Sequence, residues 1–283
     1  MQIEHKQYPN NYKYIEINNN QAHAKIALQG GHIFHFQPHN QEPILWLSPK
    51  AIFEKGKAIR GGIPICFPWF GKNKHDTSLA QHGFARTELW SVVSVDEKDE
   101  NNTYICLELT DNKRTLVQWN YHFKLHLEIT IGSALTLKLT TYNIDTKPFG
   151  ITTALHSYFD VSDISKVSVK GLDGCRYLDS LTNKYSIQKD TLTIDKEVDR
   201  IYFEPLKIIE LYDTSRTLLL TSSGSNSLVI WNPWIEKSES MADMSDDGYK
   251  TMLCLETGSV DEDFRVVEPD NSCVLKVVIR ELF

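Results

Sequence analysis

The sequence has few cysteines, and none of them forms a pair with metal-binding or redox spacing. The five are scattered along the chain without a CxxC motif: Cys66, Cys106, Cys175, Cys254 and Cys273. An odd number of cysteines without such spacing is typical of free thiols in a reducing compartment. We therefore expect small buried hydrophobic side chains rather than a disulfide framework.

Long apolar runs are also absent. No run approaches the roughly 20 residues that a helix needs to cross a bilayer. The first residues, MQIEHKQYPNNYKY, are polar and contain no signal-peptide core. We expect a cytoplasmic protein that does not contact a membrane.

Positive charge is in short supply, since 30 Lys and Arg against 37 Asp and Glu give a formal net charge of −7. Duplex nucleic acid requires a basic face, so it is not an expected partner. The chain also lacks the GxGxxG and GxxxxGK[ST] patterns that cradle nucleotide phosphates. Individual arginines would have to attract any anionic ligand against the mean field of the protein.

The chain does have the composition of an ordinary globular protein. Its 283 residues are 41% hydrophobic and 24% charged, which is enough for a large core. No linker rich in Pro or Ser divides it, and no repeat period stands out. We predict a single domain spanning residues 1–283, and a monomer.

Apolar and polar residues alternate along most of the chain. Odd-numbered positions of residues 121–130 (YHFKLHLEIT) are apolar, and residues 135–140 repeat the pattern after a Gly-Ser turn, which predicts an antiparallel hairpin. Similar runs occupy residues 104–109, 166–170, 191–194, 207–212, 217–221, 228–231 and 274–279. No long stretch has a helical period. The pattern predicts an all-β fold, a large antiparallel sandwich.

Two segments break this alternation. Residues 60–90 are rich in Gly, Pro and aromatic residues, and residues 232–248 are rich in acidic residues and Met. Long irregular segments on a rigid β scaffold commonly carry binding groups. We therefore expect these segments to contribute to a functional site.

The first irregular segment places two arginines beside glycines. Arg60 begins RGGIPICFPWFG, and Arg86 ends QHGFAR. A guanidinium offers a planar fork of donors to phosphate or carboxylate, although a solvated surface arginine would give the same pattern. Two such arginines favour anion capture, and the neighbouring amide and imidazole of Gln81 and His82 suit a polyhydroxyl ligand.

Two titratable residues lie in otherwise apolar stretches that are predicted to be strands. His156 lies in TTALHSYF and Glu256 in LCLETG. A lone histidine there is more often a satisfied core residue, whereas a carboxylate is costly unless it is paired, hydrogen-bonded or functional. Together they are candidates for a general acid and base. Their separation in sequence does not show whether they meet.

The other histidines form no recognisable metal motif. His122 and His126 lie four residues apart on one strand, hence about 13 Å apart. His32 and His35 lack the ligand spacing of a zinc site. We expect no metal.

Taken together, these segments resemble the hexose-6-phosphate mutarotases of the aldose 1-epimerase superfamily. The resemblance rests on six motifs in family order: RGGIPICFPWFG (60–71), QHGFAR (81–86), TALHSYF (153–159), DRIY (199–202), NPWIEKSESMADM (232–244) and LCLETG (253–258). No single motif is decisive, but the ordered set is specific and spans most of the chain. The resemblance implies a galactose mutarotase-like β-supersandwich and no cofactor.

The resemblance also implies a role for each site residue. His156 would protonate the ring oxygen of the sugar, and Glu256 would take the proton of the anomeric hydroxyl. Arg60 and Arg86 would bind the phosphate. Contacts with the sugar itself would come from Gln81, His82 and Asp199.

These roles predict an isomerase that interconverts the α and β anomers of hexose 6-phosphates, chiefly glucose 6-phosphate. A neutral aldose 1-epimerase would keep the acid and base but make the arginines structural. A non-catalytic carbohydrate-binding protein is a third interpretation, because fold alone proves no function. Its stacking platforms would be Trp69, Trp231 and Trp234. Glycoside hydrolysis is disfavoured because it usually needs two facing carboxylates.

Overall fold

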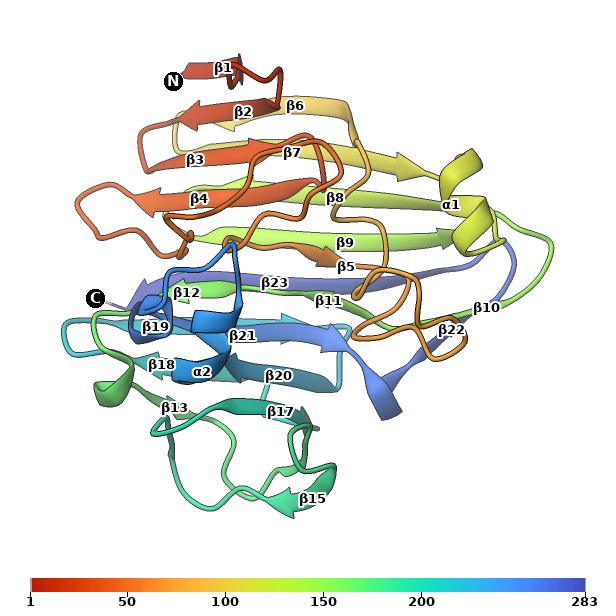
Figure 1. Cartoon of the computed structure of the whole chain (residues 1–283). Helices are drawn as coiled ribbons and strands as arrows, with labels where there is room; N and C mark the ends of the chain where they lie inside the picture. Colours follow the sequence, from red (N-terminus) through yellow and green to blue (C-terminus); the bar gives the residue numbers. More distant parts are fainter. Residues whose placement is uncertain (1, 283) are drawn as a thin grey trace.

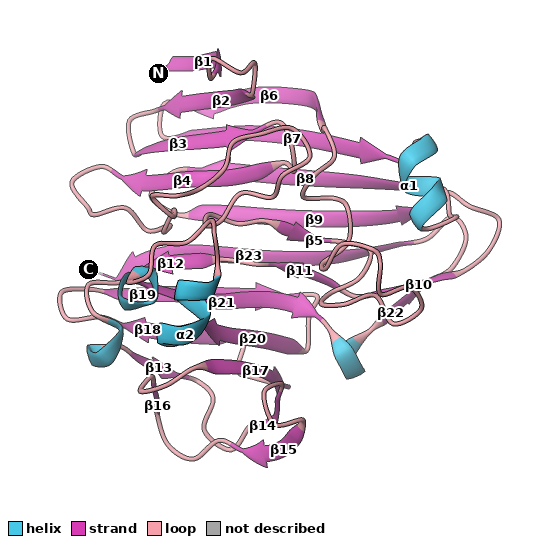
Figure 2. Ribbon diagram, in the orientation of Figure 1, coloured by secondary structure: helices cyan, strands magenta, loops and turns pink. Residues whose placement is uncertain are grey.

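Antiparallel sheets make up most of the regular secondary structure of the molecule. The computed structural model describes residues 2–282, and at residues 97–99 it describes the backbone alone. Figure 1 shows the strands arranged in two stacked layers, and Figure 2 shows how little helix lies among them. The all-β prediction is confirmed.

One layer is a nine-stranded antiparallel sheet. In hydrogen-bonded order its strands are β16 (Leu192–Thr193), β13 (Ser168–Lys170), β18 (Ile208–Tyr212), β19 (Thr217–Ser223), β23 (Ser272–Leu282), β9 (Leu135–Asn143), β8 (Phe123–Ile131), β7 (Asn102–Thr110) and β6 (Ser91–Asp99). Every run of alternating residues predicted above contributes a strand to this sheet, except residues 228–231. Those residues lie in the other layer.

The other layer combines two sheets. The first is β1 (Gln2–Gln7), β2 (Lys13–Asn18), β3 (Ala22–Ala27) and β4 (His32–Pro38). The second runs β15 (Lys184–Ile187), β14 (Arg176–Asp179), β17 (Val198–Phe203), β20 (Ser227–Asn232), β21 (Met252–Ser259), β11 (Thr153–Leu155) and β5 (Ile65–Cys66), with β12 (Tyr158–Asp160) also paired to β21. A separate ribbon pairs β10 (Phe149–Ile151) with β22 (Arg265–Val267).

The main core lies between the layers, and β8 shows how the sequence builds it. Phe123, Leu125, Leu127 and Ile129 are fully buried, whereas the residues between them are partly exposed. The strand pairs with β9 in the predicted hairpin register. Alternation therefore reports a strand with one buried face.

Strand β21 is different because it is buried on both faces. Leu253 and Leu255 belong to the main core cluster. Since side chains alternate along a strand, Cys254 and Glu256 point to the opposite side of the sheet. That second face carries the functional groups described below.

Helical segments are short and lie in the connections. They are α1 (Lys113–Gln118), α2 (Trp234–Ser240) and the 3₁₀ turns Ile164–Lys166, Gly248–Thr251 and Asp261–Asp263. Helix α2 lies in the segment that the sequence predicted as irregular, because two turns are too short to show a helical period. No helix among the described residues has the length and apolar character to span a membrane.

Candidate active site

A pocket of about 570 Å³ opens on the outer side of β21 and β17. All seven predicted site residues line it: Arg60, Gln81, His82, Arg86, His156, Asp199 and Glu256. They come from the loops on either side of β5, the junction of β11 and β12, and strands β17 and β21. Folding thus gathers groups that are widely separated in sequence.

His156 lies at an interruption between β11 and β12, and not inside a continuous strand as its local sequence predicts. Its backbone N–H donates to the carbonyl of Pro64 at 3.0 Å. The N–H of Tyr158 donates to the carbonyl of Gly62 at 2.9 Å. These hydrogen bonds to Gly62 and Pro64 therefore keep β11 and β12 separate and set the position of the imidazole.

Gly62 is required for this close packing. Its φ is +63°, and a Cβ atom there would lie 2.3 Å from the carbonyl oxygen of Ile33 and 2.7 Å from Nε2 of His32. Nε2 of His32 lies 2.7 Å from the carbonyl oxygen of Gly61. Because a carbonyl oxygen can only accept a hydrogen bond, Nε2 of His32 carries the ring proton. Only glycine combines this conformation with this approach.

His156 and Glu256 meet at the floor of the pocket. Nε2 of the histidine lies 3.3 Å from Oε1 of the glutamate, and the two side chains are 8% and 1% exposed. Nδ1 of His156 and Oε2 of Glu256 are buried without a hydrogen-bond partner among the described residues. Because buried polar atoms are nearly always satisfied, these atoms in a pocket indicate groups that await a ligand.

Burial disfavours the charged form of both residues. It lowers the pKa of His156 well below 6.5, and the positive charges of Arg86 and Arg60 add to the effect. Burial and the charge of Asp199 raise the pKa of Glu256 well above 4.5, while Arg86 opposes this. The pair therefore holds one proton between them, as neutral imidazole with carboxylic acid or as imidazolium with carboxylate.

Tyr158 holds the imidazole of His156 from one side. The two rings stack with centroids 4.8 Å apart and planes inclined by 6°. The Tyr158 hydroxyl accepts a hydrogen bond from Nη1 of Arg60 at 3.0 Å, and Nε of Arg60 donates to Oδ1 of Asp243 at 3.2 Å. A chain of contacts thus connects the acidic loop, which is the part of residues 232–248 that follows α2, to His156. The sequence analysis identified neither Tyr158 nor Asp243.

Two further contacts, from Ser48 and Lys50, hold the acidic loop in place. The Ser48 hydroxyl donates to the carbonyl of Asp243 at 2.7 Å, and Lys50 forms an ion pair with Asp246 at 3.4 Å. Met241 of the same loop lines the pocket. The loop therefore already forms one wall of the site.

His82 presents a defined tautomer to the pocket. Its Nδ1 accepts the backbone N–H of Gly71 at 3.3 Å and lies 3.4 Å from the thiol sulfur of Cys66. A neutral ring then carries its proton on Nε2. Burial, together with Arg86 and Arg60, lowers the pKa of His82 to about 3, so the ring stays a neutral hydrogen-bond donor at physiological pH.

Of the two arginines, Arg86 forms fewer hydrogen bonds and ion pairs with the described residues. Its Nη2 donates to the backbone carbonyl of Gln81 at 2.7 Å, and no carboxylate pairs with it among the described residues. Asp199 lies on β17 across the pocket, where burial raises the pKa of its carboxyl. Arg86 therefore retains donors for an anion, and Asp199 is a candidate acceptor for sugar hydroxyls.

Three lysines also line the pocket and were missed by the sequence analysis. Lys237 pairs with Glu197 at 2.8 Å and Lys74 with Asp261 at 3.7 Å, while Lys72 lies exposed at the rim. The KNKH run directly after residues 60–71 was the available signal for Lys72 and Lys74. These lysines and the two arginines place five cationic side chains in the lining of the pocket, beside Asp199, Glu256 and Asp261.

The three tryptophans offer little as stacking platforms. Trp69 is 8% exposed, and its indole N–H donates to the carbonyl of Ala80. Trp234 packs on Tyr249 with centroids 5.1 Å apart. Of the three, Trp231 alone lines the pocket, and it too is 8% exposed. The arrangement does not favour a non-catalytic binding module.

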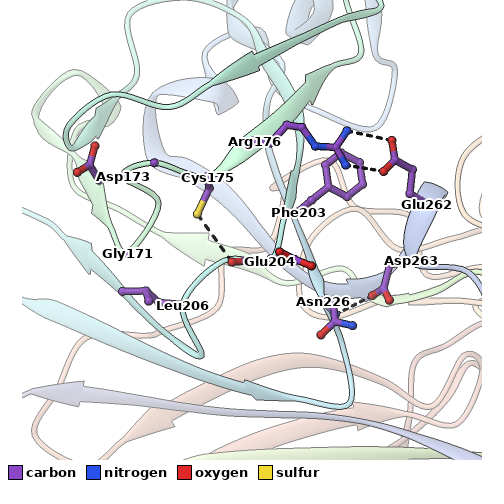
Figure 3. A pocket seen from close by; sticks show the side chains of 11 residues that line it. Gly171, Asp173, Cys175, Arg176, Phe203, Glu204, Leu206, Asn226, Glu262 and Asp263 are labelled. Atoms are coloured by element: carbon purple, nitrogen blue, oxygen red, sulfur yellow. Dashed lines mark hydrogen bonds and ion pairs between the residues drawn. The ribbon is translucent and has the colours of Figure 1, made fainter.

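A second hollow of about 740 Å³ lies near β14 and is shown in Figure 3. Its Arg176 forms a two-pronged ion pair with Glu262, and its Asp263 accepts the N–H of Asn226 and pairs with Arg265. None of its described side chains has a buried polar atom without a partner. It lacks the features of a catalytic centre.

Comparison with solved structures confirms the galactose mutarotase-like fold. The crystal structure of a galactose mutarotase related enzyme from Lactobacillus acidophilus superposes with a TM-score of 0.75 at 14% identity, covering 95% of this chain and 97% of that chain. At that identity the likeness concerns the fold alone.

Closer relatives are found by sequence. Residues 13–280 match the model of the aldose 1-epimerase family. A protein of Salmonella typhimurium named "putative glucose-6-phosphate 1-epimerase" is 37% identical over 247 residues, which cover 86% of this chain and 82% of that protein. One of the same name from Cenchrus ciliaris is 38% identical over 251 residues, covering 84% and 75%.

A solved structure agrees with these matches. The crystal structure of a "putative mutarotase" from Salmonella typhimurium superposes with a TM-score of 0.93 at 32% identity, and the superposition covers 99% of this chain and 93% of that chain. Since the family model spans nearly the whole sequence, this chain belongs to the aldose 1-epimerase family of isomerases.

Proposed function

We propose that the protein interconverts the α and β anomers of hexose 6-phosphates, with glucose 6-phosphate as its chief substrate. The observation that carries the proposal is the buried pair of His156 and Glu256, 3.3 Å apart in a pocket that two arginines line. The printed names of the relatives agree with this substrate class.

The pair has the geometry that anomer exchange requires. Ring opening removes a proton from the C1 hydroxyl and delivers one to the ring oxygen, and both oxygens are bonded to C1. An acid and a base must therefore lie side by side, as His156 and Glu256 do. The carboxylate of Glu256 accepts the hydroxyl proton while the imidazolium of His156 protonates the ring oxygen. After rotation about C1–C2, the two roles reverse and the ring closes on the other face.

Two proton-transfer groups are sufficient for this chemistry. Each is typically worth 10²–10⁴-fold, so the pair could lower the barrier by roughly 5–10 kcal/mol if the effects combined fully. The uncatalysed reaction already proceeds slowly in water. The mechanism requires no covalent nucleophile.

A phosphate on the substrate supports the mechanism electrostatically. The positive charges of Arg86 and Arg60 are among the causes that lower the pKa of His156. A bound phosphate would offset those charges and so favour the imidazolium form that donates to the ring oxygen. Neutral sugars would not provide this compensation, which favours phosphorylated substrates over free ones.

The experiment that tests the proposal is NMR exchange spectroscopy on equilibrated glucose 6-phosphate, with free glucose and galactose in parallel. We expect catalysed exchange between the α and β C1 proton signals, much faster for the phosphate ester. Acceleration of the free sugars alone would assign the protein to the neutral aldose epimerases. Line broadening without exchange would indicate binding without catalysis.

A further inference from the structure

A third group with ligand chemistry lies beside the proton-transfer pair. The thiol of Cys254, a ring nitrogen of His156 and a carboxylate oxygen of Glu256 all lie within 4.8 Å of one another, and all three residues are buried. Among the side chains that the structure describes, this is the one group of three or more His, Cys, Asp or Glu ligand atoms that could surround an ion. The mechanism above uses the histidine and the glutamate but not the thiol.

The fold holds this group in place. Cys254 and Glu256 are two residues apart on β21, so they point to the same side of the sheet. Cys254 pairs with Trp231 of β20 on one side and with Tyr158 of β12 on the other. Because both neighbouring strands are hydrogen-bonded to β21, the two ligands lie on one of the most constrained strands of the sheet.

The distances suit a tetrahedral ion. Zinc bonds of about 2.0–2.3 Å place neighbouring ligand atoms about 3.3–3.7 Å apart. His156 Nε2 and Glu256 Oε1 are 3.3 Å apart without an ion. The sulfur atom lies within 4.8 Å of both, so it would approach them on binding an ion. In addition, Oε2 of Glu256 is buried without a partner among the described residues.

The chemistry of the donors selects the class of ion. Imidazole, thiolate and carboxylate are the donors of zinc sites, whereas Mg²⁺ and Ca²⁺ take six or more ligands, almost all oxygen. We propose that His156, Cys254 and Glu256 form a binding site for Zn²⁺ or another thiophilic divalent cation, with the fourth position open to the pocket.

Charge balance favours binding. Binding releases two protons to solvent, the thiol proton of Cys254 and the proton held between His156 and Glu256. Bonds from sulfur, nitrogen and oxygen to the metal then form without any change of oxidation state. Thiolate and carboxylate then neutralise the two charges of the ion. The nearby charge of Asp199 favours the cation, and those of Arg60 and Arg86 oppose it.

The bound ion would occupy the atoms that transfer protons. Zinc on His156 and Glu256 removes both the acid and the base, so it inhibits epimerisation and competes with the sugar. This consequence rests on the proposed function, whereas metal binding itself does not. The protein would then lose activity in response to free zinc.

Cobalt spectroscopy tests the site independently of activity. Titration of the purified protein with Co²⁺ should produce a sulfur-to-cobalt charge-transfer band and the intense visible bands of tetrahedral cobalt. Zn²⁺ should displace the cobalt and so remove all of these bands. Mg²⁺ at millimolar concentration should neither produce these bands nor remove those of bound cobalt. An absence of the charge-transfer band in the intact protein would overturn the proposal.

Substitutions locate the ligands. Cys254→Ser should abolish the charge-transfer band and weaken zinc binding at least about tenfold, since even partners outside the ligand sphere contribute 10–100-fold. Glu256→Gln should also weaken zinc binding, which guards against a misfolded cysteine variant. Cys175→Ser changes a half-buried thiol elsewhere and serves as the control that keeps the band.

Inhibition is measured separately on glucose 6-phosphate exchange. Zinc should inhibit the intact protein reversibly, with activity restored by a chelator, and should inhibit Cys254→Ser at least about tenfold less strongly. Cobalt binding without any epimerase activity would contradict the proposed function and leave the metal site standing. Equal zinc affinity in the intact protein and Cys254→Ser would exclude the thiol as a ligand.

Discussion

Neither His156 nor Glu256 can stay charged alone in its buried position, and this dependence explains their pairing. Burial lowers the pKa of the histidine and raises that of the glutamate. One proton shared between them keeps the pair neutral overall in either arrangement. Moving that proton is therefore far less costly than ionising either residue by itself.

Removing either member of the pair should abolish most of the catalysed rate. His156→Ala or Glu256→Gln deletes a group whose contribution is typically about 10²–10⁴-fold. Exchange spectroscopy on glucose 6-phosphate measures the loss, and circular dichroism checks that the fold is intact. Near-full activity in either variant would refute the assignment of acid and base.

The two arginines should respond differently to substitution. Arg86 has no carboxylate partner among the described residues, so Arg86→Ala should chiefly raise KM for the phosphate ester. A charge-assisted hydrogen bond is worth about 1.5–3 kcal/mol, which corresponds to a change of roughly 10- to 150-fold. Arg60 also holds the tyrosine that stacks on His156, so Arg60→Ala should raise KM and lower kcat as well.

Steady-state exchange rates on glucose 6-phosphate and on free glucose separate these effects. Arg86→Ala should leave the rate on free glucose nearly unchanged, whereas Arg60→Ala should lower it. An unchanged preference for the phosphate ester in both variants would count against phosphate binding by either arginine.

At the scale of elements, strands were predictable where one face is buried and the other meets solvent. The alternation in β8 and β9 gave their pairing and their turn. In β21 all eight residues are buried, so no alternation marks which face carries Glu256. Helix α2 has only seven residues, too few for a helical period. The interruption at His156 comes from hydrogen bonds to a distant loop, which local sequence does not encode.

The site was predictable in its membership but not in its contacts. The motifs nominated all seven residues that now share one pocket. The link from Asp243 through Arg60 to Tyr158 depends on contacts between residues far apart in sequence, and no local pattern predicts it. The same holds for Cys254, whose thiol resembles an ordinary core side chain until its neighbours are known.

The loop that carries Gln81, His82 and Arg86 should be sensitive to a single methyl group. Gly83 has a φ of +69°, and a Cβ atom there would lie 2.0 Å from the carbonyl oxygen of Phe67. Gly83→Ala should therefore destabilise the protein and displace the loop, with a loss of activity. Thermal unfolding and exchange spectroscopy measure the two effects.

Gly56→Ala is the matched control. Gly56 has a similar φ of +79°, but a methyl group added there would have no atom within 4 Å, so the substitution reports backbone strain alone. That strain is about 1–2 kcal/mol. Gly83→Ala should exceed this value and lower activity, whereas Gly56→Ala should leave activity intact. Equal effects on stability would show that the Phe67 contact has no role.

At the scale of the whole molecule, one core joins the layers. The main cluster includes Ile15 of the four-stranded sheet, Ile129 of the nine-stranded sheet and Leu255 of the eight-stranded sheet. His32 is fully buried at the start of β4, where it donates to the carbonyl of Gly61. This hydrogen bond connects the core to the loop that begins at Arg60. Protonation of His32 would therefore affect both the stability of the molecule and that loop.

Stability should fall as the pH drops from 6.5 to 4, in part because of His32. Burial lowers the pKa of His32 from 6.5 to about 4. Between these values the unfolded chain takes up a proton that the folded protein refuses, so stability present above pH 6.5 is lost as the pH falls. A shift of this size corresponds to about 3 kcal/mol by pH 4.

The variant His32→Gln isolates this contribution, because an amide can still donate to Gly61 but does not titrate. Urea unfolding at pH 7 and pH 4 gives the free energy of unfolding at both values. The intact protein should lose about 3 kcal/mol more than His32→Gln over this range, whatever the absolute stability of the variant. His75→Gln replaces an exposed histidine, surrounded by water in both states, and should follow the intact protein. If His32→Gln also followed it, the buried histidine would not be the source of the acid sensitivity, and another buried group would have to be.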